Sequence, residues 1–561
     1  MTVPSADDPS GDVPASKPSS LGRASALMAS GSMVSRVLGI VRNMLLGACI
    51  GGLGGTSSAF NTANTLPNTI FILLSSGVLT AILIPQITRA LKRDGGGSDA
   101  INALLTGCFG LITLVTLLAT ALAGPLMQLM GLRGDALVLG VAFAYLCLPQ
   151  IFFYAAYAVW SQVLNVQGRF GLVMWTPALA NLVQIVGMIA FLALFTGQAP
   201  PQEWTPEMIW LLAGTSTLGV AVQALALVPA VHAAGLRYRP NFHFRGHGFR
   251  ASGTVATLMM VAVIIAQLSG VVTQAAINTV SEGARLAGQL VPNITVYAFA
   301  FTIFMVPHGI VTVSILTALL PRMTRSSLDG DTGAVRNDVV RGLVLPLLAM
   351  LPMTAAAVAL AYPGSKLLNP SLDEPSVRAI AWSFSLMSLG LVPFAVAGLQ
   401  QRFATAREDG RQYLRFQLIV SGIQLLVAGL IFVLPASVAV YTVSLGQTVS
   451  NGVAAVVFLW SVQRRLGGLP LRRLGSIALR LGSASVLAAL PAWFAVEWIG
   501  RVWERGALHA LVLLVLGAAI FGVGLLVTVR IFRVWELNWL LGRAGRFLVP
   551  AIPEDAEPLY R

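Results

Sequence analysis

Long apolar segments alternate with short polar ones along nearly the whole chain. After a polar N-terminal stretch, most apolar segments run for about 20 residues or more, the length a helix needs to cross the hydrocarbon core of a bilayer. The fold class this pattern predicts is an all-α polytopic membrane protein. About fourteen transmembrane helices are expected, at approximately residues 26–50, 58–88, 101–126, 136–164, 172–197, 208–235, 252–280, 287–320, 340–363, 377–403, 412–434, 437–463, 476–499 and 507–533.

The composition agrees with this interpretation. Apolar residues make up 56% of the 561 residues, charged residues only 10%, and the mean hydropathy is +0.79. These values are typical of helical membrane proteins and exclude an ordinary soluble domain. The three cysteines, Cys49, Cys108 and Cys147, lie singly in apolar segments, so we interpret them as core residues and predict no metal site and no cofactor.

An internal repeat relates the two halves of the chain. Residues 80–89 and 317–325 both end in Pro-x-[Ile/Met]-Thr-Arg, and both follow an earlier proline, Pro67 or Pro307, that stands next to a polar residue. Because six spans separate the two motifs, we expect two six-helix lobes of the same orientation around a central cavity, with two extra C-terminal helices outside the repeat. Pro67, Gly77 and Pro307 are the expected hinges, and the alternative is that they are passive kinks.

The chain divides into six regions on this basis. They are a disordered cytoplasmic N-terminal tail (1–24), an N-lobe with spans 1–6 (25–235), a basic cytoplasmic loop between the lobes (236–251), a C-lobe with spans 7–12 (252–465), a pair of further spans, 13 and 14 (466–535), and a cytoplasmic C-terminal tail (536–561).

Basic residues are distributed unevenly among the loops. If the N-terminus is cytoplasmic, the even-numbered loops and both tails hold 28 of the 36 Lys and Arg residues, the opposite loops hold six, and two lie inside the first span. Since cytoplasmic loops are enriched in positive charge, we expect a multi-pass protein of the plasma (inner) membrane with both termini cytoplasmic. The net charge of +14 is then a topology signal, and the cluster at 237–250 should face anionic lipids, not nucleic acid.

The two cations inside the first span, Arg36 and Arg42, are the strongest functional clue. A charge at mid-bilayer costs roughly 2.5 to 3.5 kcal/mol, so it normally faces a wet cavity or a partner. No apolar segment has an Asp or Glu in its interior, so the expected partner is an anion from outside the protein, such as a phosphate or pyrophosphate. On a helix the two side chains project about 120° apart, which lets them bracket one anion. The alternative is snorkelling to the interface, which Arg42, near the far end of the span, can reach more readily than Arg36.

Further polar residues inside the spans are candidates for the cavity wall. Asn64, Asn68 and His308 are predicted to bind substrate together with the two arginines, and the alternative is that such side chains only join helices by hydrogen bonds. The same choice applies to Asn61, Gln150, Asn181, Gln184, Gln267, Gln274, Asn278 and Asn293. No GxSxG, HExxH or P-loop motif occurs, so we expect a transporter and not an enzyme.

At these residues the chain resembles a known family. The similarity to the MurJ (MviN) lipid II flippases, of the multidrug/oligosaccharidyl-lipid/polysaccharide exporter (MOP) superfamily, lies in Ser-Arg-Val-Leu-Gly-Ile-Val-Arg (35–42), Ala-Phe (59–60), Leu-Pro-Asn (66–68), Gly77, Pro85, Pro-x-Gly-Ile (307–310) and Thr-Ala-Leu-Leu-Pro-Arg (317–322).

The resemblance implies a function in peptidoglycan biosynthesis. It implies that lipid II, the undecaprenyl-pyrophosphate-linked disaccharide pentapeptide, moves from the inner to the outer leaflet of the plasma membrane by alternating access. Arg36 and Arg42 would engage the pyrophosphate, and spans 13 and 14 would form a groove for the lipid tail. The implied partners are lipid II, membrane lipids and proteins of cell-wall synthesis or division.

The chain departs from the family pattern at several charged positions. Ser58 stands where the family usually has an aspartate, and Phe71 and Ile72 stand where arginines often occur. Ser76 replaces a common glutamate, and Thr302 aligns with a third arginine. Spans 7 and 11 also lack the carboxylates through which some members bind sodium. Two other functions therefore stay open, namely another exporter of the superfamily, for lipid-linked polysaccharide or drugs, and a non-transporting scaffold for cell-wall enzymes.

Overall fold

The computed structural model describes residues 18–75, 98–235, 238–242, 254–502, 506–542 and 545–553. This part of the chain is helical and contains no strand. Twelve of its helical segments are long and apolar enough to cross a membrane, and the pair α17 (Glu374–Ser388) and α18 (Leu391–Ala406), bent by 54°, makes a thirteenth. Each matches one of the expected spans. The second expected span, 58–88, is described only as far as residue 75, and the all-α polytopic fold is confirmed.

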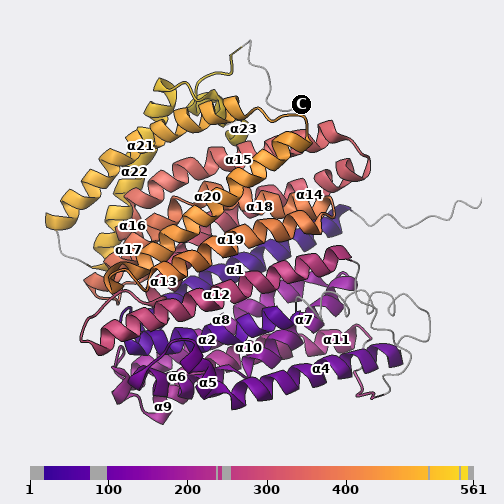
Figure 1. The fold of residues 1–561 in the computed structure, drawn as a ribbon, viewed down its shortest axis with the longest axis vertical. Coiled ribbons are helices and arrows are strands. Elements are labelled where there is room, and N and C mark those ends of the chain that lie inside the picture. Colours follow the sequence, from indigo (N-terminus) through magenta and orange to yellow (C-terminus); the bar gives the residue numbers. More distant parts are fainter. Residues whose placement is uncertain are drawn as a thin grey trace, which may run out of the picture.

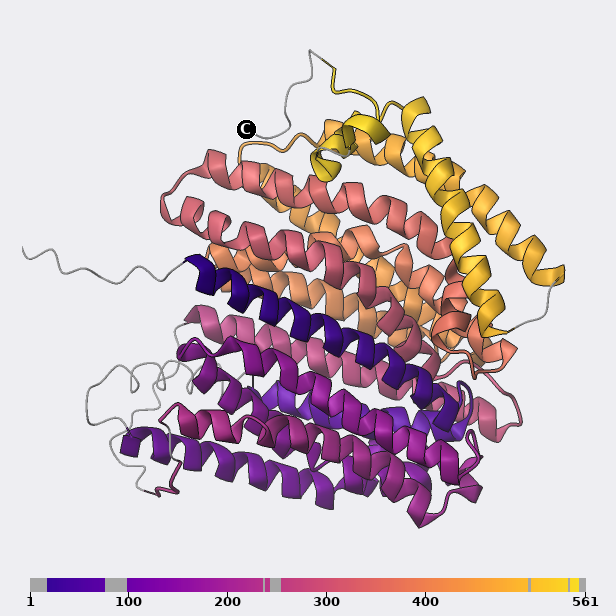
Figure 2. The same ribbon diagram turned by 180° about the vertical axis from the view of Figure 1, so that it is seen from behind.

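The first half of the chain forms one bundle, the N-lobe, coloured indigo to magenta in Figures 1 and 2. Its core is aromatic where the helices meet: Phe143 packs edge-to-face on both Phe60 and Trp204, and Trp204 stacks on Phe191. The helices are α1 (Pro18–Ile50), α2 (Gly55–Leu74), α4 (Ser98–Ala121), α5 (Ala123–Leu129), α6 (Gly134–Cys147), α7 (Gln150–Val166), α8 (Phe170–Leu194), α9 (Pro206–Ile209), the π-turn η3 (Trp210–Gly214), α10 (Thr215–Leu225) and α11 (Val228–Ala233).

The second half forms the C-lobe, coloured pink to orange in the same views. Its helices, besides α17 and α18, are α12 (Thr254–Leu286), α13 (Ile294–Pro307), the π-turn η4 (His308–Thr312), α14 (Val313–Leu328), α15 (Thr332–Ala359), α16 (Ala361–Leu368), α19 (Gly410–Leu430) and α20 (Ala439–Arg465). In Figure 2, α1 crosses the molecule between the bulk of the two lobes.

The eighth expected span is interrupted at its middle. Helix α13 ends at Pro307, and the next five residues, His308–Thr312, form a π-turn before α14 continues the span. A proline removes one backbone donor and pushes against the carbonyl four residues earlier, so a local change of helix type follows. Pro67, in contrast, lies within a continuous α2. Gly77, the other expected hinge, lies outside the described residues.

Two more helices, α21 (Leu471–Val502) and α22 (Ala507–Ile531), lie on the outer side of the C-lobe (Figures 1 and 2). Alanines make this packing close: Ala488 and Ala492 of α21 cluster with Ala355 and Ala359 of α15. Small side chains of this kind let membrane helices approach each other. The chain then ends in short pieces, η6 (Trp535–Leu537), α23 (Asn538–Leu541) and α24 (Gly545–Leu548).

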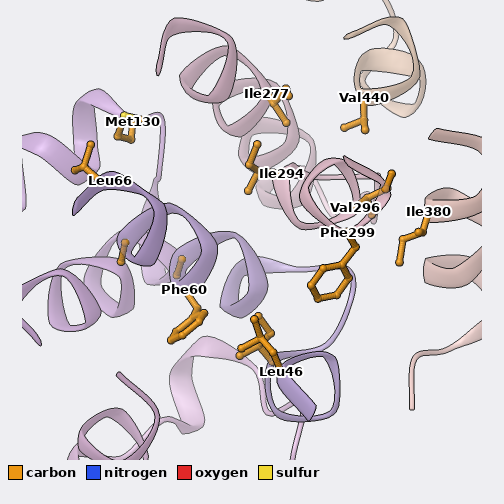
Figure 3. Close-up of a cluster of buried hydrophobic side chains, with 14 of the residues drawn as sticks. Leu46, Phe60, Leu66, Met130, Ile277, Ile294, Val296, Phe299, Ile380 and Val440 are labelled. Carbon is orange, nitrogen blue, oxygen red and sulfur yellow. The ribbon is translucent and has the colours of Figure 1, made fainter. Parts of the chain in front are cut away.

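The two lobes meet at one end of the bundle, where α1 and α12 end and α2 and α13 begin. We call this the closed end. Apolar side chains from both lobes fill it, including Leu46 and Phe60 of the N-lobe and Ile277 and Phe299 of the C-lobe (Figure 3). Side-chain amides also cross from lobe to lobe: Asn293 to Gly54 O and Ser57 Oγ, Asn61 to Thr295 Oγ1 at 2.8 Å, Asn278 to Thr62 Oγ1 and Met130 O, each at 2.9 Å, and Gln198 to Ser371 O.

The ends of the expected regions differ in detail. Helix α1 begins at Pro18, inside the stretch 1–24 expected as a tail, and residues 1–17 lie outside the described part of the chain. Most of the expected inter-lobe loop, 236–251, also lies outside it. Near the C-terminus, the buried carboxylate of Glu536 pairs with Arg480 of α21. This ion pair holds the segment that follows α22 against α21.

Candidate functional site

A cavity of about 540 Å³ lies between α2 of the N-lobe and helices α12, α13, α18, α19 and α20 of the C-lobe. None of its described lining residues is Asp, Glu, Lys or Arg. The wall is instead rich in side-chain amides, with aromatic rings between them. The amides belong to Asn61, Gln274, Gln401, Gln417, Gln424, Gln447 and Asn451.

The amides differ in how far the protein already occupies their hydrogen-bonding capacity. Gln447 accepts a hydrogen bond of 3.0 Å from the hydroxyl of Tyr297, and Asn61 is held by Thr295. The side-chain amides of Gln274 and Gln401 form no hydrogen bond with any described residue. These two amides therefore remain available to a ligand.

His308 is the predicted site residue that does line this cavity. The π-turn η4 places its ring edge-to-face on Phe394, with 4.5 Å between centroids. The side chain is only 8% exposed, and its Nδ1 atom has no hydrogen-bond partner in the described part of the chain. The hydroxyl of Thr312, one turn further on, is also buried without a partner among those residues. Two unpaired polar groups are thus located around this break in the span.

Arg36 lies outside the cavity wall but close to the same break. Its side chain is exposed and makes no hydrogen bond or ion pair with any described residue. The guanidinium lies against the backbone of Gly309: a Cβ placed there would be 3.6 Å from Arg36 Nη1. A cation of the N-lobe therefore contacts the broken helix of the C-lobe at Gly309, the residue that follows His308.

Arg42, in contrast, is partly buried and engaged within the N-lobe. Its Nε and Nη2 donate to Oδ1 of Asn43 at 3.3 and 3.0 Å, and Nη1 donates to Oδ1 of Asn181 at 3.3 Å. Asn181 in turn donates to the carbonyl oxygen of Ser35 at 2.9 Å. Helices α1 and α8 therefore fix the position of this cation.

The two predicted asparagines of α2 do not line the cavity. Asn64 accepts a hydrogen bond of 3.2 Å from Nε2 of Gln150, which also donates to Thr217, so it joins α2 to α7. Asn68 is exposed near the end of the described part of α2. For Asn64 the geometry follows the alternative of helix–helix hydrogen bonding, and a substrate role for either residue stays a prediction.

Several cavity residues escaped the sequence prediction. Gln401, Gln417, Gln424, Gln447 and Asn451 come from the last three spans of the C-lobe, where no repeat motif drew attention. Their spacing contained a signal: seven residues separate the two glutamines of α19, and four separate the two amides of α20. Such spacings put side chains on one face of a helix.

The positions at which the family pattern has charges are occupied differently here. Phe71 stacks on Tyr154 with ring centroids 5.9 Å apart, and Thr302 lines the neutral cavity. Ser58 shares a small recess at the closed end with Glu282, a buried carboxylate paired with Arg285 at 2.8 Å. Within the described residues, no three His, Cys, Asp or Glu side chains gather in a way that would hold a metal ion.

Comparison with known proteins decides the family. The sequence model described as "Lipid II flippase MurJ" matches residues 48–517. The chain belongs to the MurJ family. Its members are transporters, so the chain is one too, and not an enzyme. The matched region begins after Arg36 and Arg42, so the assignment does not depend on the arginine motif.

Relatives and solved structures agree with this family assignment. The chain is 24% identical to the probable lipid II flippase MurJ of Synechocystis sp., over 87% of this chain and 89% of that protein. It is 24% identical to the lipid II flippase MurJ of Burkholderia cenocepacia, over 88% and 94%. A solved lipid II flippase MurJ in an "inward closed conformation" has the same fold, with a TM-score of 0.67, 16% identity and coverage of 89% and 98%.

A more distant structural match places the fold in a wider group. An inward-facing multidrug transporter of the MATE family, from the MOP superfamily, matches with a TM-score of 0.57 and 15% identity, over 79% of this chain and 98% of that one. Its coverage of this chain is smaller than that of the MurJ structure. The chain therefore shares its fold with this transporter.

Proposed function

We propose that this protein is a lipid II flippase, which moves lipid II from the inner to the outer leaflet of the plasma membrane. Membership of the MurJ family supports the substrate and the reaction. The observation that carries the proposal at the site is Arg36, a cation on a membrane-spanning helix with no partner among the described residues. Such a cation is costly unless an anionic ligand or water compensates it.

The pyrophosphate of lipid II is the ligand group that Arg36 would bind. A guanidinium presents several donors in one plane, which suits the oxygens of a diphosphate. Arg42 would add positive potential to the site while Asn43 and Asn181 hold it in place. In this arrangement Arg36 makes direct contact with the ligand and Arg42 acts mainly through its charge.

The distribution of contacts between the lobes supports alternating access. If both termini are cytoplasmic, as the loop charges predict, the closed end faces the outside of the cell. The conformation described here would then be closed toward the outside, and lipid II, which is made in the cytoplasm, would enter from that side. Opening to the outside would require separation of the amide contacts at the closed end, among them those of Asn278 and Asn293.

The lipid tail is proposed to stay in the bilayer beside α21 and α22. These two helices expose many large apolar side chains, including Leu479, Val486, Phe494 and Val515. They stand outside the two lobes, against α15 and α16 (Figure 1). A polyprenyl chain would bury apolar surface there while the head group crosses.

Transport by purified protein in proteoliposomes tests the proposal. Fluorescent lipid II in the outer leaflet is quenched by a membrane-impermeant reductant, so protein-dependent exchange appears as an increase in the quenched fraction. We expect exchange with the wild type and with Arg133→Ala, an exposed arginine of a loop, and a large loss with Arg36→Ala. Equal rates with wild type, Arg36→Ala and empty liposomes would contradict the proposal and favour the scaffold alternative.

A further inference from the structure

The neutral cavity of the C-lobe differs in chemistry from the arginine site. We propose that it binds the uncharged carbohydrate of a lipid-linked substrate, while Arg36 binds the diphosphate beside it. This inference rests on the proposed function and adds a location for the sugar. Its starting point is the wall of the cavity, which has seven amide side chains and no described charged side chain.

Charged ligands do not suit this cavity. An anion or cation that enters it loses water and finds no countercharge on the described wall, which is unfavourable in a low-dielectric environment. A diphosphate therefore fits the guanidinium of Arg36 better than the cavity. A cationic drug would similarly find no carboxylate on the described wall to pair with. The ligand that remains is polar and uncharged.

The wall matches the hydrogen-bonding groups of an N-acetylated sugar. Each glutamine or asparagine side chain both donates and accepts, as do sugar hydroxyls and acetamido groups. The side-chain amides of Gln274 and Gln401 and Nδ1 of the 92%-buried His308 have no hydrogen-bond partner among the described residues. Three polar groups from three helical segments are thus available to a ligand. A few polar groups placed in this way orient small molecules in pockets.

Aromatic rings supply the apolar part of the wall. Tyr297 and Phe301 lie parallel within 5° and with centroids 6.3 Å apart, and Phe394 faces His308. The flat apolar faces of sugar rings pack against such surfaces. A volume of about 540 Å³ falls within the range of about 300–1,000 Å³ that is usual for small-molecule sites, so one or two sugar rings are a reasonable content.

The two sites are arranged as the substrate requires. In lipid II the sugar is attached directly to the diphosphate. His308 lines the cavity, and the guanidinium of Arg36 lies against Gly309, the next residue along the broken span. One ligand can therefore place its diphosphate on Arg36 and its sugar among the amides. The π-turn η4 is the element that both groups would contact.

Binding of separate fragments tests the inference. The probes are the β-1,4-linked disaccharide of N-acetylglucosamine, followed by saturation-transfer NMR, and inorganic pyrophosphate, followed by phosphorus NMR line width, each with the full chain in nanodiscs. The variants are Gln274→Leu and Gln401→Leu in the cavity and Arg36→Ala at the cation. Gln128→Leu, an exposed amide of α5, is the matched control.

We expect the disaccharide to bind the wild type and the control, and each cavity variant to lose about threefold or more of that binding. Pyrophosphate binding should stay unchanged in the cavity variants, which also shows that they are folded, and should be lost in Arg36→Ala. Equal disaccharide binding by all the proteins, or none to the wild type up to about 10 mM, would overturn the inference.

Failure of the proposed function would look different. If the disaccharide depends on Gln274 and Gln401 but no protein exchanges fluorescent lipid II, the cavity is a carbohydrate site and the flippase proposal is wrong. If lipid II is exchanged but disaccharide binding is the same in the wild type and in both glutamine variants, the flippase proposal stands and the cavity inference is wrong.

Discussion

Two of the polar regions in the described membrane-spanning part of this protein differ in charge and in lobe. The first is the pair of arginines on α1 of the N-lobe; the second is the amide-lined cavity, which belongs mostly to the C-lobe. They meet at the π-turn after Pro307, where Arg36 approaches Gly309 and His308 faces the cavity. The difference suggests that the lobes recognise different parts of one head group.

The comparison continues within the arginine pair itself. Arg42 donates hydrogen bonds to Asn43 and Asn181, whereas Arg36 has no hydrogen-bond or ion-pair partner among the described residues. Two residues of the same type, on the same helix, are thus expected to have different functions. Position in the sequence distinguishes them only by distance from the end of the span, which does not predict the hydrogen bonds of Arg42 to the asparagines.

The largest expected effect is that of Arg36→Ala on transport. A hydrogen bond to a charged group contributes about 1.5–3 kcal/mol, so loss of the contact should slow exchange of lipid II about 10- to 100-fold. Arg36→Lys keeps the charge but not the planar donors, and should recover only part of the rate. Initial rates in proteoliposomes measure both. Full activity of the alanine variant would show that the free arginine does not bind substrate.

A second prediction separates Arg42 from Arg36. Asn181→Leu removes the acceptor of one Arg42 donor and leaves a partly buried polar group unpaired, at a cost of about 1–3 kcal/mol in stability. We expect a lower unfolding midpoint in detergent, with a smaller loss of transport than in Arg36→Ala. The double variant Arg42→Ala and Asn181→Leu should be less destabilised than the sum of the two single variants. Strict additivity would show that the pair is not coupled.

The third prediction concerns the contacts that close one end. Asn278 donates to Thr62 and to the carbonyl of Met130, both in the other lobe. Interhelical hydrogen bonds in membranes average about 0.6 kcal/mol each, so Asn278→Leu should shift the equilibrium toward opening of this end by about fivefold to tenfold. Distances between spin labels on α5 and α12 measure the shift. An unchanged distance distribution would mean that the apolar contacts alone close this end.

The smallest effect is expected at Gly309. A Cβ there would meet Arg36 Nη1 at 3.6 Å, an ordinary van der Waals distance, so Gly309→Ala should change transport less than about twofold. A larger side chain, as in Gly309→Leu, should displace the guanidinium and reproduce much of the Arg36→Ala loss. If both variants transport at the wild-type rate, the position of the Arg36 guanidinium beside Gly309 is not required for transport.

The large elements of the fold were predictable because each follows from a local property. Span length and loop charge are read directly along the chain, and the repeated Pro-x-[Ile/Met]-Thr-Arg motif indicated two lobes. A break at Pro307 was expected because proline acts on its own helix, but the same reasoning failed at Pro67, where α2 is continuous. The count of spans and their order required no knowledge of the packing.

The site was harder to predict because it depends on which way a side chain faces in the assembled bundle. Asn61 and Asn64 are three residues apart on α2, yet one lines the cavity and the other bonds to Gln150. The π-turn at His308 also changes the angular register of the span, so a regular helical projection fails beyond it. Gln401 carries no sequence signal beyond its polarity.

The most direct measurement of the central claim is the accessibility of lipid II in the outer leaflet of cells depleted of this protein and supplied with either the wild type or Arg36→Ala. The account predicts that lipid II stays inside depleted cells, that the wild type restores its exposure, and that Arg36→Ala, present at the same level in the membrane, does not. Rescue by Arg36→Ala equal to that by the wild type would contradict the role of this arginine in translocation.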